Sequence, residues 1–353
     1  MRIGGKFHLT YCSNIHPGES WEEVRRNLEE YVPPIRGQLS PQSSFGIGLR
    51  LSAQAAETLE EPENLTRFRA FLADQNCYLF TINGFPYGIF HRTRVKEEVY
   101  LPDWKDERRL NYSNRLARLL AKLLPEDPAL EGSVSTVPGA FKANVRSTDD
   151  VSRMADLLFR HVAFLNTLRL QTGKTVSLAL EPEPCCYLET VDETLAFFRD
   201  WIFNLDRLKN LAFELGVSTE QAEVITRRHL GICYDTCHMA VEFEQPAAAL
   251  ERLADSGIKI CKVQISSGLK LQFRSGDGRP QALLGPFAES TYLHQVVEEY
   301  GGGLVRYTDL PEGLARESSS SAGVDDHHPS PPQPPAPTPS SQRCPHCGVG
   351  DLM

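Results

Sequence analysis

The stretch LGICYDTCH (residues 230–238) begins as an apolar strand and ends in an acid, a thiol and an imidazole. Short apolar runs of this kind are typical of strands that are buried on both faces of a parallel sheet. In parallel α/β proteins, ligands bind outside the carboxyl ends of the strands. The stretch therefore predicts a parallel sheet whose reactive polar groups gather at one end.

Other stretches share this strand-like character, and amphipathic helical patterns lie between them. We expect further strands at residues 7–12, 45–51, 77–83, 132–138, 176–184 and 258–267. We expect helices at residues 21–39, 65–75, 111–124, 149–171, 191–213, 219–228 and 246–256. Ser52, Ser147 and Ser218 stand where helix N-caps are expected, because a serine hydroxyl can accept a free N–H of the first turn.

Strands that alternate with helices indicate right-handed βαβ units and therefore a parallel sheet. Two folds fit this pattern, a doubly wound open sheet and a (β/α)8 barrel. The open sheet usually carries a glycine-rich phosphate loop after its first strand, and no such loop follows residues 7–12. Polar residues at the carboxyl ends of the strands are typical of barrels. We therefore predict an α/β protein with the (β/α)8 TIM-barrel fold.

The chain changes character after about Arg316. Residues 318–342 are rich in proline and serine and lack apolar periodicity, which is typical of a disordered segment. We predict a barrel domain over residues 1–316 and a disordered tail over residues 317–353. The tail also contains half of a zinc motif, CPHC at residues 344–347, but a structural zinc site needs four ligands.

Composition narrows the functional class. The net charge of −9 provides no broad basic face, which disfavours nucleic-acid binding. No apolar run approaches the roughly 20 residues that span a membrane, and the amino terminus lacks a signal-peptide pattern. The nine cysteines are irregularly spaced, which favours reduced thiols over a disulfide framework. These features predict a cytoplasmic protein.

The polar residues at the strand ends suggest a site for a metal or a substrate. Glu181 and Glu183 follow one apolar strand, Asp235 and His238 end the next, and Gln264 lies in the matching place on the strand after that. Carboxylate and amide oxygens suit Mg²⁺ or Mn²⁺ more than Zn²⁺. The alternative is that each acid is a salt-bridged or capping group, which is the commoner role of a single acid at a strand end.

Further residues could line the same end of the barrel as substrate-binding groups. His8 lies on the first strand, and Asn83 ends the strand at residues 77–83. Glu183 and Lys262 accompany the predicted metal ligands Glu181 and Gln264, and Lys262 could instead pair with an acid. Each of these residues is as readily explained by a structural role.

Several motifs together resemble one known family. NIHPGESW (14–21), FGIGLRLS (45–52), TINGFPYG (81–88), LALEPEP (178–184), GICYDTCHMA (231–240), KVQISS (262–267) and LVRYTDLPE (304–312) are similar to the EboE family, called metabolite traffic protein EboE. That family lies within the xylose isomerase-like barrel superfamily. The resemblance covers roughly residues 1–316.

The resemblance implies a xylose isomerase-like (β/α)8 barrel that binds a divalent metal ion (Mg, Mn or Zn) through Glu181, Asp235, His238 and Gln264. It also implies a bacterial protein of a pathway that moves or processes a small-molecule metabolite, with proteins of the same gene cluster as partners. Relatives continue into a last strand that supplies another acid, whereas Pro/Ser-rich sequence occupies that place here. The barrel is therefore expected to lack its last strand.

Two functions of different class follow. The first is a metal-dependent isomerase or epimerase of a sugar or polyol, in which Glu181 moves a proton and His238 orients the substrate. The second is a non-catalytic barrel that binds or carries a metabolite, because barrels host both kinds of function. Phosphodiester cleavage is a weaker third option, because the net negative charge of the chain disfavours a basic groove that would bind phosphates.

Overall fold

The structure is a computed structural model, and it describes residues 1–88, 96–273, 280–288, 290 and 292–320. Residues Met1–Leu314 form one compact unit. The predicted boundary after residue 316 stays a prediction, and the CPHC motif lies outside the described residues. No helix in the described ranges is both long enough and apolar enough to cross a membrane.

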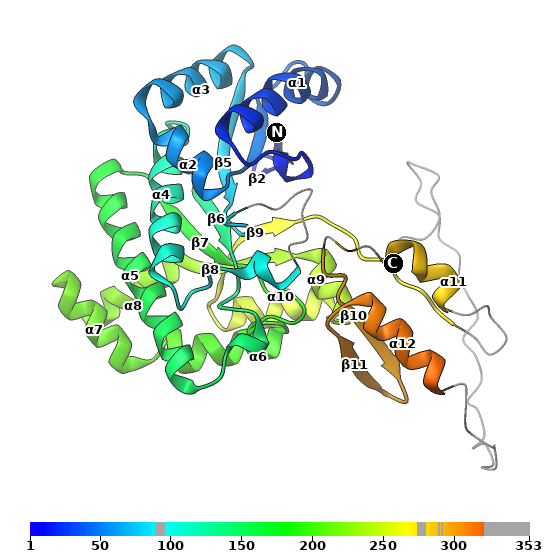
Figure 1. The fold of residues 1–353 in the computed structure, drawn as a ribbon. Helices are drawn as coiled ribbons and strands as arrows, with labels where there is room; N and C mark the ends of the chain where they lie inside the picture. Colours follow the sequence, from blue (N-terminus) through cyan, green and yellow to red (C-terminus); the bar gives the residue numbers. More distant parts are fainter. Residues whose placement is uncertain (89–95, 274–279, 289, 291, 321–353) are drawn as a thin grey trace. The chain divides into compact units, whose positions relative to one another are not determined.

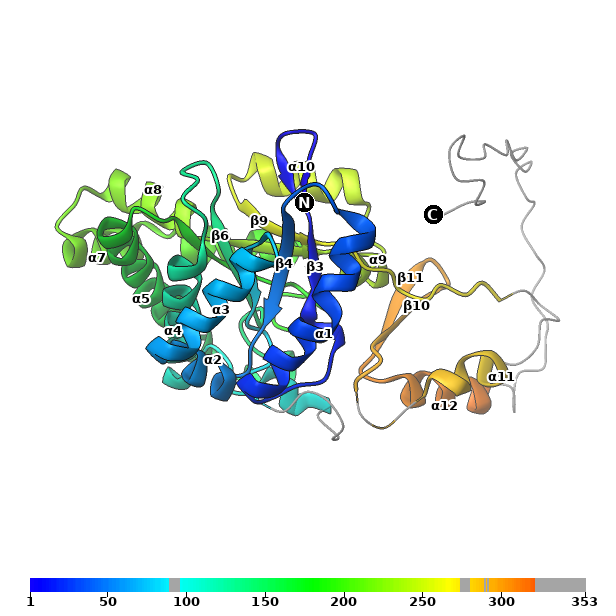
Figure 2. The same ribbon diagram turned by 90° about the horizontal axis from the view of Figure 1, so that it is seen from above.

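A curled parallel sheet forms the centre of this unit (Figures 1 and 2). Its strands pair in chain order, each parallel to the next. They are β3 (Thr10–Cys12), β4 (Phe45–Arg50), β5 (Cys77–Asn83), β6 (Gly132–Thr136), β7 (Val176–Leu180), β8 (Leu230–Asp235) and β9 (Lys259–Gln264). Sequential parallel pairing is the topology of a TIM barrel, which confirms the predicted fold class.

Burial explains why β4, β7 and β8 are mostly apolar, whereas β6 is made mostly of small and polar residues that are buried as well. Every residue of β4, β6, β7 and β8 is buried, because helices cover the outer face and side chains fill the inside. By contrast, β9 is only partly buried, and Val263 in it is 51% exposed. The core therefore lies along the middle of the sheet rather than at its last strand.

Helices follow most of the strands and surround the sheet (Figure 1). They are α1 (Trp21–Leu39), α2 (Ala53–Glu60), α3 (Pro62–Asp74), α4 (Glu107–Leu123), α5 (Thr148–Thr172), α6 (Val191–Phe197), α7 (Leu205–Leu215), α8 (Thr219–His229), α9 (Thr236–Val241) and α10 (Pro246–Asp255). The predicted caps are confirmed: Ser52, Ser147 and Ser218 each accept a backbone N–H of the first turn.

Several predicted elements differ from the structure, and the strands predicted over 176–184 and 258–267 end at Leu180 and Gln264. The helix predicted over residues 191–213 consists of α6, a π-helical turn η4 (Phe198–Ile202) and α7, because Asn204 caps a new helix. The strand predicted over 7–12 is divided between β3 and β2 (Phe7–His8), which pairs with β1 (Arg2–Ile3). The strand predicted over 230–238 ends at Asp235, which caps α9.

The sheet has two edges within the described residues, β3 and β9. The LVRYT segment does not join it. β10 (Val296–Tyr300) and β11 (Gly303–Tyr307) instead form a separate antiparallel hairpin. The chain after β9 also contains α11 (Pro280–Leu284) and α12 (Leu310–Ser320). The described residues thus contain no eighth barrel strand, as the sequence led us to expect.

Candidate metal and substrate site

Glu181, Asp235 and Gln264 meet at the carboxyl ends of β7, β8 and β9. The Gln264 amide nitrogen donates to Glu181 Oε1 at 2.5 Å and to Asp235 Oδ2 at 2.6 Å. The sheet register places Asp235 directly beside Gln264, and Glu181 follows the last residue of β7. The three predicted oxygen ligands are therefore brought together by parallel pairing of neighbouring strands.

Asp235 connects the end of β8 to the start of α9. Its Oδ1 accepts the Cys237 backbone N–H at 3.0 Å and also accepts the Ser266 hydroxyl. Burial alone would raise the pKa of Asp235, but the adjacent His238 and these hydrogen bonds outweigh it and lower the pKa. Asp235 is therefore a carboxylate at neutral pH.

Glu181 is the most perturbed acid of the site. It is 4% exposed, and its Oε2 has no hydrogen-bond partner among the described residues. Burial raises the pKa of Glu181 to about 7, against the opposing charges of His238 and Lys262. A carboxyl group with such a pKa can hold or release a proton near neutral pH.

His238 lies on α9, close to the acids. Its buried Nδ1 has no hydrogen-bond partner among the described residues. Burial would lower the pKa of His238, but the contact with Cys237 and the charges of Glu183, Asp235 and Glu181 raise it. Cys237 and the surrounding acids therefore favour the protonated imidazole.

Cys237 is a site residue that was not among the ligands predicted from the sequence. Ligand atoms of Asp235, Cys237 and His238 all lie within 4.8 Å of one another. The sequence DTCH (235–238) could have indicated this cluster. One turn of helix after the strand end brings the side chains of Asp235, Cys237 and His238 close together. A thiol in this set broadens the donor chemistry toward softer metals such as Zn²⁺.

Glu183 is buried beside the other acids but has its own partners. Its Oε1 accepts the Tyr100 hydroxyl at 2.5 Å and the Gln295 amide at 3.3 Å. Burial raises the pKa of Glu183. Tyr100 lies 83 residues before Glu183 and Gln295 lies 112 residues after it, so no local sequence signal could have identified either partner.

The other predicted substrate-binding residues, Lys262, Asn83 and His8, bond to groups other than the acids. Lys262 donates to Ser135 Oγ at 3.1 Å, inside the barrel, rather than to one of the acids. Asn83 ends β5, and its side-chain oxygen accepts the Phe85 N–H at 3.0 Å. His8 precedes β3 and contacts Tyr78 at the start of β5, with Nδ1 3.0 Å from the hydroxyl. His8 therefore lies at the amino ends of the strands, and the structure does not bring it to the acids.

The residues present fit a divalent cation. Glu181 Oε2 and His238 Nδ1 are buried without hydrogen-bond partners among the described residues, and two carboxylates flank one amide. The Gln264 amide nitrogen lies between the two carboxylates, and a half-turn of the amide would present its oxygen there instead. The donor set of carboxylates, amide oxygen and imidazole is one that binds Mg²⁺, Mn²⁺ or Zn²⁺.

No protein-family model matches this sequence, and no curated protein matches it. Among solved structures, it is similar to a D-tagatose 3-epimerase-like protein, with 15% identity over 73% of this chain and 75% of the other and a TM-score of 0.42. It is also similar to a xylose isomerase-like TIM barrel protein from Mycobacterium smegmatis in complex with magnesium, with 12% identity, coverage of 71% and 73%, and a TM-score of 0.43.

A xylose isomerase domain protein from Planctomyces limnophilus matches with 14% identity and a TM-score of 0.39, over 62% of each chain. The match thus spans less than two thirds of that protein. Two of these proteins are named as xylose isomerase or xylose isomerase-like proteins, and one is named as an epimerase-like protein. At these identities and TM-scores, the likenesses carry no information about the activity of this chain.

Proposed function

We propose that this protein is a divalent-metal-dependent isomerase or epimerase of a small sugar or polyol. The observation that carries the proposal is the convergence of Glu181 and Asp235 on the single Gln264 amide. Two buried carboxylates need a compensating cation or proton, which His238 supplies without a metal and which a metal ion could supply in its place. A metal-binding site gives this arrangement a physical reason.

The proposed metal ligands are Glu181, Asp235, His238 and Gln264. His238 must lose its proton to coordinate, so metal binding would release a proton and would strengthen as the pH rises. When bound there, a divalent cation supplies electrostatic stabilisation of negative charge on two adjacent substrate oxygens. Cys237 could add a thiolate for Zn²⁺.

We assign proton transfer to Glu181 because its buried Oε2 has no hydrogen-bond partner among the described residues and can therefore take up or release a proton. The proton would leave the carbon beside a carbonyl group and return to the neighbouring carbon or to the opposite face. No oxidant or reductant is needed. Glu183 and Lys262 remain proposed contacts for the substrate hydroxyl groups.

Metal analysis of the purified protein tests the proposal. We expect about one divalent ion per chain after incubation with Mg²⁺, Mn²⁺ or Zn²⁺ and removal of excess metal. Glu181→Gln and Asp235→Asn should lose it. Asp103→Asn is the matched control, because Asp103 is also buried but is paired with Lys105 away from the site. A wild-type protein that retains none of the three metals would overturn the proposal.

A non-catalytic metabolite-binding protein is the second candidate. It is favoured by the partners that one oxygen of each acid already has, since Gln264 donates to Glu181 Oε1 and Asp235 Oδ2 and Tyr100 donates to Glu183 Oε1. Proton exchange separates the candidates. An isomerase or epimerase should introduce deuterium from D₂O into a bound aldose or ketose, as followed by NMR, whereas a carrier should bind the sugar without exchange.

We also propose membership of the EboE family, on the support of motifs such as LALEPEP (178–184) and GICYDTCHMA (231–240). This proposal includes a bacterial cytoplasmic location and a role beside products of the same gene cluster. Co-purification of the tagged protein with products of neighbouring genes would support it. Neighbouring genes that encode unrelated pathways, and no such co-purification, would contradict it.

A further inference from the structure

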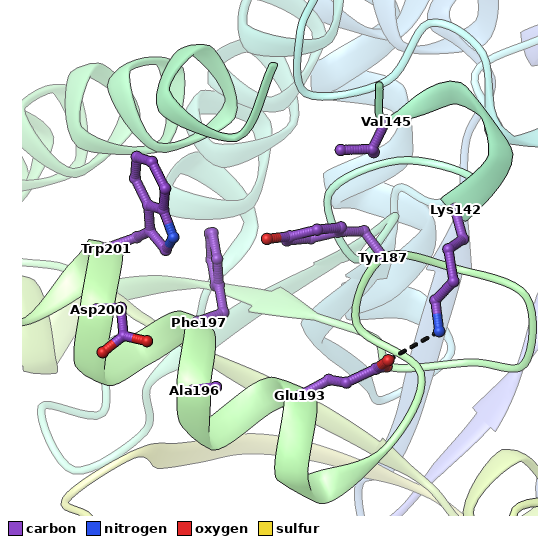
Figure 3. Close-up of a pocket in the computed structure, with 8 residues that line it drawn as sticks. All are labelled: Lys142, Val145, Tyr187, Glu193, Ala196, Phe197, Asp200 and Trp201. Atoms are coloured by element: carbon purple, nitrogen blue, oxygen red, sulfur yellow. Dashed lines mark hydrogen bonds and ion pairs between the residues drawn. The ribbon is translucent and has the colours of Figure 1, made fainter. Parts of the chain in front are cut away.

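A groove of about 380 Å³ lies beside the loops that follow β6 and β7 (Figure 3). The residues that line it come from η3 (Lys142–Asn144), the loop after β7, α6 and the π-helical turn η4. They are Lys142, Val145, Tyr187, Glu193, Ala196, Phe197, Asp200 and Trp201. None of the proposed metal ligands is among them, so the groove is separate from that site.

Aromatic side chains form much of the groove. Tyr187 and Phe197 pack edge to face, with ring centroids 5.9 Å apart. The Tyr187 hydroxyl points toward Phe197 and Trp201, and the Trp201 indole nitrogen lies on the side of its ring nearest Phe197 (Figure 3). The Arg207 guanidinium lies 5.2 Å from the centre of the Trp201 ring and helps to fix it. The polar edges of two aromatic rings are therefore presented to the groove.

These polar edges have no partners within the described residues. Neither the Tyr187 hydroxyl nor the Trp201 indole N–H makes a hydrogen bond there. The charged groups of the groove, by contrast, are already paired. Lys142 lies 2.8 Å from Glu193 and also contacts Glu189, and Asp200 binds Arg199. The groove thus offers hydrogen-bonding groups without an unpaired charge.

The π-helical turn explains how this wall of the groove is made. η4 interrupts the helix between α6 and α7, and the consecutive residues Asp200 and Trp201 within it both line the groove. Single π-helical turns inside helices are rare and occur frequently at functional sites. A continuous α-helix over residues 191–213 would present a different set of side chains at this position.

We propose that this groove binds a neutral polyhydroxylated ring, such as one sugar unit. The aromatic surfaces can pack against the C–H groups of such a ring, while the Tyr187 hydroxyl and Trp201 N–H bond to its hydroxyl groups. The volume lies in the range of about 300 to 1,000 Å³ of small-molecule sites. An organic cation favours unpaired carboxylates, whereas Glu193 and Asp200 of the groove are paired with Lys142 and Arg199.

This inference does not rest on the proposed isomerase activity, and the test keeps the two separate. The probe is methyl β-D-glucopyranoside, a locked ring that lacks the free carbonyl group needed for isomerisation. Trp201 is partly exposed, whereas Trp21 and Trp104 are 2% and 0% exposed. A glycoside-dependent change in tryptophan fluorescence would therefore come from Trp201.

We expect saturable binding of the glycoside, followed by fluorescence and by saturation-transfer NMR. The NMR signal should weaken at least about ten-fold in Trp201→Ala, and binding should weaken about two- to ten-fold in Tyr187→Phe, which removes one neutral hydrogen bond. Phe213→Ser is the control for the loss of an aromatic side chain, because Phe213 is 91% exposed and does not line the groove. Glu181→Gln should leave glycoside binding unchanged.

Three outcomes would overturn the proposal. The first is the absence of saturable binding up to about 10 mM glycoside, a range that includes weak millimolar complexes. The second is binding of choline, but not of the glycoside, in the same assay. The third is glycoside binding that survives Tyr187→Phe and Trp201→Ala but is lost in Glu181→Gln. If Trp201→Ala fails to fold, Tyr187→Phe still tests the proposal, because it removes only the hydroxyl group and preserves the packing of the ring.

Discussion

At the scale of single residues, burial decides which polar side chains are unusual. Glu181 has a raised pKa because it is enclosed at the end of an apolar strand. Burial also shifts the pKa of two histidines outside the site. Burial lowers the pKa of His161 to about 3 and the pKa of His229 to about 4. Both imidazoles are therefore neutral in the folded protein.

The buried histidines predict a loss of stability in acid. Their pKa values are lower in the folded state than the unfolded value near 6.5, so the unfolded chain binds more protons below that pH. Their contribution to stability is complete above pH 6.5 and falls toward pH 4, by about 1.4 kcal/mol per pH unit for each histidine. Urea unfolding at pH 7, 6 and 5 should show this slope.

His161→Gln/His229→Gln provides the control for that slope. The double variant should unfold more easily at pH 7, because both side chains are well packed, but its stability should vary less between pH 7 and 5. His161 Nδ1 lies 2.6 Å from Asn114 Oδ1, and His229 Nδ1 lies 2.7 Å from the Val176 carbonyl oxygen. An unchanged pH slope in the variant would show that other groups cause the acid sensitivity.

Gln264→Glu tests the charge balance of the metal site. A third carboxylate beside Glu181 and Asp235 should lower the melting temperature in EDTA, because like charges repel in a buried site. Mn²⁺ should raise that temperature more than it does in the wild type, since the variant offers the metal an additional charged ligand. Gln264→Met should respond less to Mn²⁺ than the wild type does. Equal responses of all three proteins to Mn²⁺ would contradict the predicted ligand role.

At the scale of elements, ion pairs join the β10–β11 hairpin to the barrel. Arg306 of β11 bonds to Glu242 after α9 through Nε at 2.8 Å and Nη2 at 2.7 Å. The Glu242 side chain is fully buried, and burial raises its pKa despite the contact with Arg306. Asp309, two residues beyond β11, also pairs with Lys96. The hairpin is thus attached to the barrel by charges from distant parts of the chain.

Arg306→Met should loosen this hairpin. Removal of the guanidinium leaves the Glu242 carboxylate buried beside Glu189, which we expect to cost about 3 kcal/mol, because breaking a buried ion pair strands its partner. Hydrogen exchange of the β10 and β11 amides should accelerate more than exchange in β7. Arg306→Met/Glu242→Gln should recover part of the protection. No recovery in the double variant would show that Arg306 acts through packing alone.

At the scale of the whole molecule, the sheet has open edges. β3 and β9 each have one neighbouring strand within the described part of the chain, and apolar residues are exposed along and after β9. Val263 is 51% exposed and Ile265 is 81% exposed. Unpaired strand edges with apolar side chains are templates for association with other strands.

The open edge predicts self-association that rises with concentration. Sedimentation velocity over a range of protein concentrations should reveal it, and Val263→Lys should reduce it, because a charge on an edge strand opposes strand pairing. Leu170→Lys is the matched control, since Leu170 is 73% exposed on α5, away from the edges. A wild-type protein that remains monomeric at all concentrations would contradict this prediction.

The sequence by itself determined the fold class and much of the local structure. Parallel strands buried on both faces are mostly apolar, and serine caps mark where helices begin, so β4, β5 and α8 could be predicted closely. The positions of Glu181, Asp235 and Gln264 followed from the same rule, because parallel strand ends meet at one end of the sheet.

The tertiary structure decided which distant groups meet. Tyr100 and Gln295 reach Glu183 across 83 and 112 residues, and Arg306 reaches Glu242 across 64. His8 was expected near the acids, which lie at the carboxyl ends of the strands. It lies at the opposite end, because it precedes the first residue of β3 in the chain. Periodicity and caps act over one or two turns, whereas these contacts depend on how whole elements pack. That difference in range is why the sequence alone determined the strands and only the folded chain completed the site.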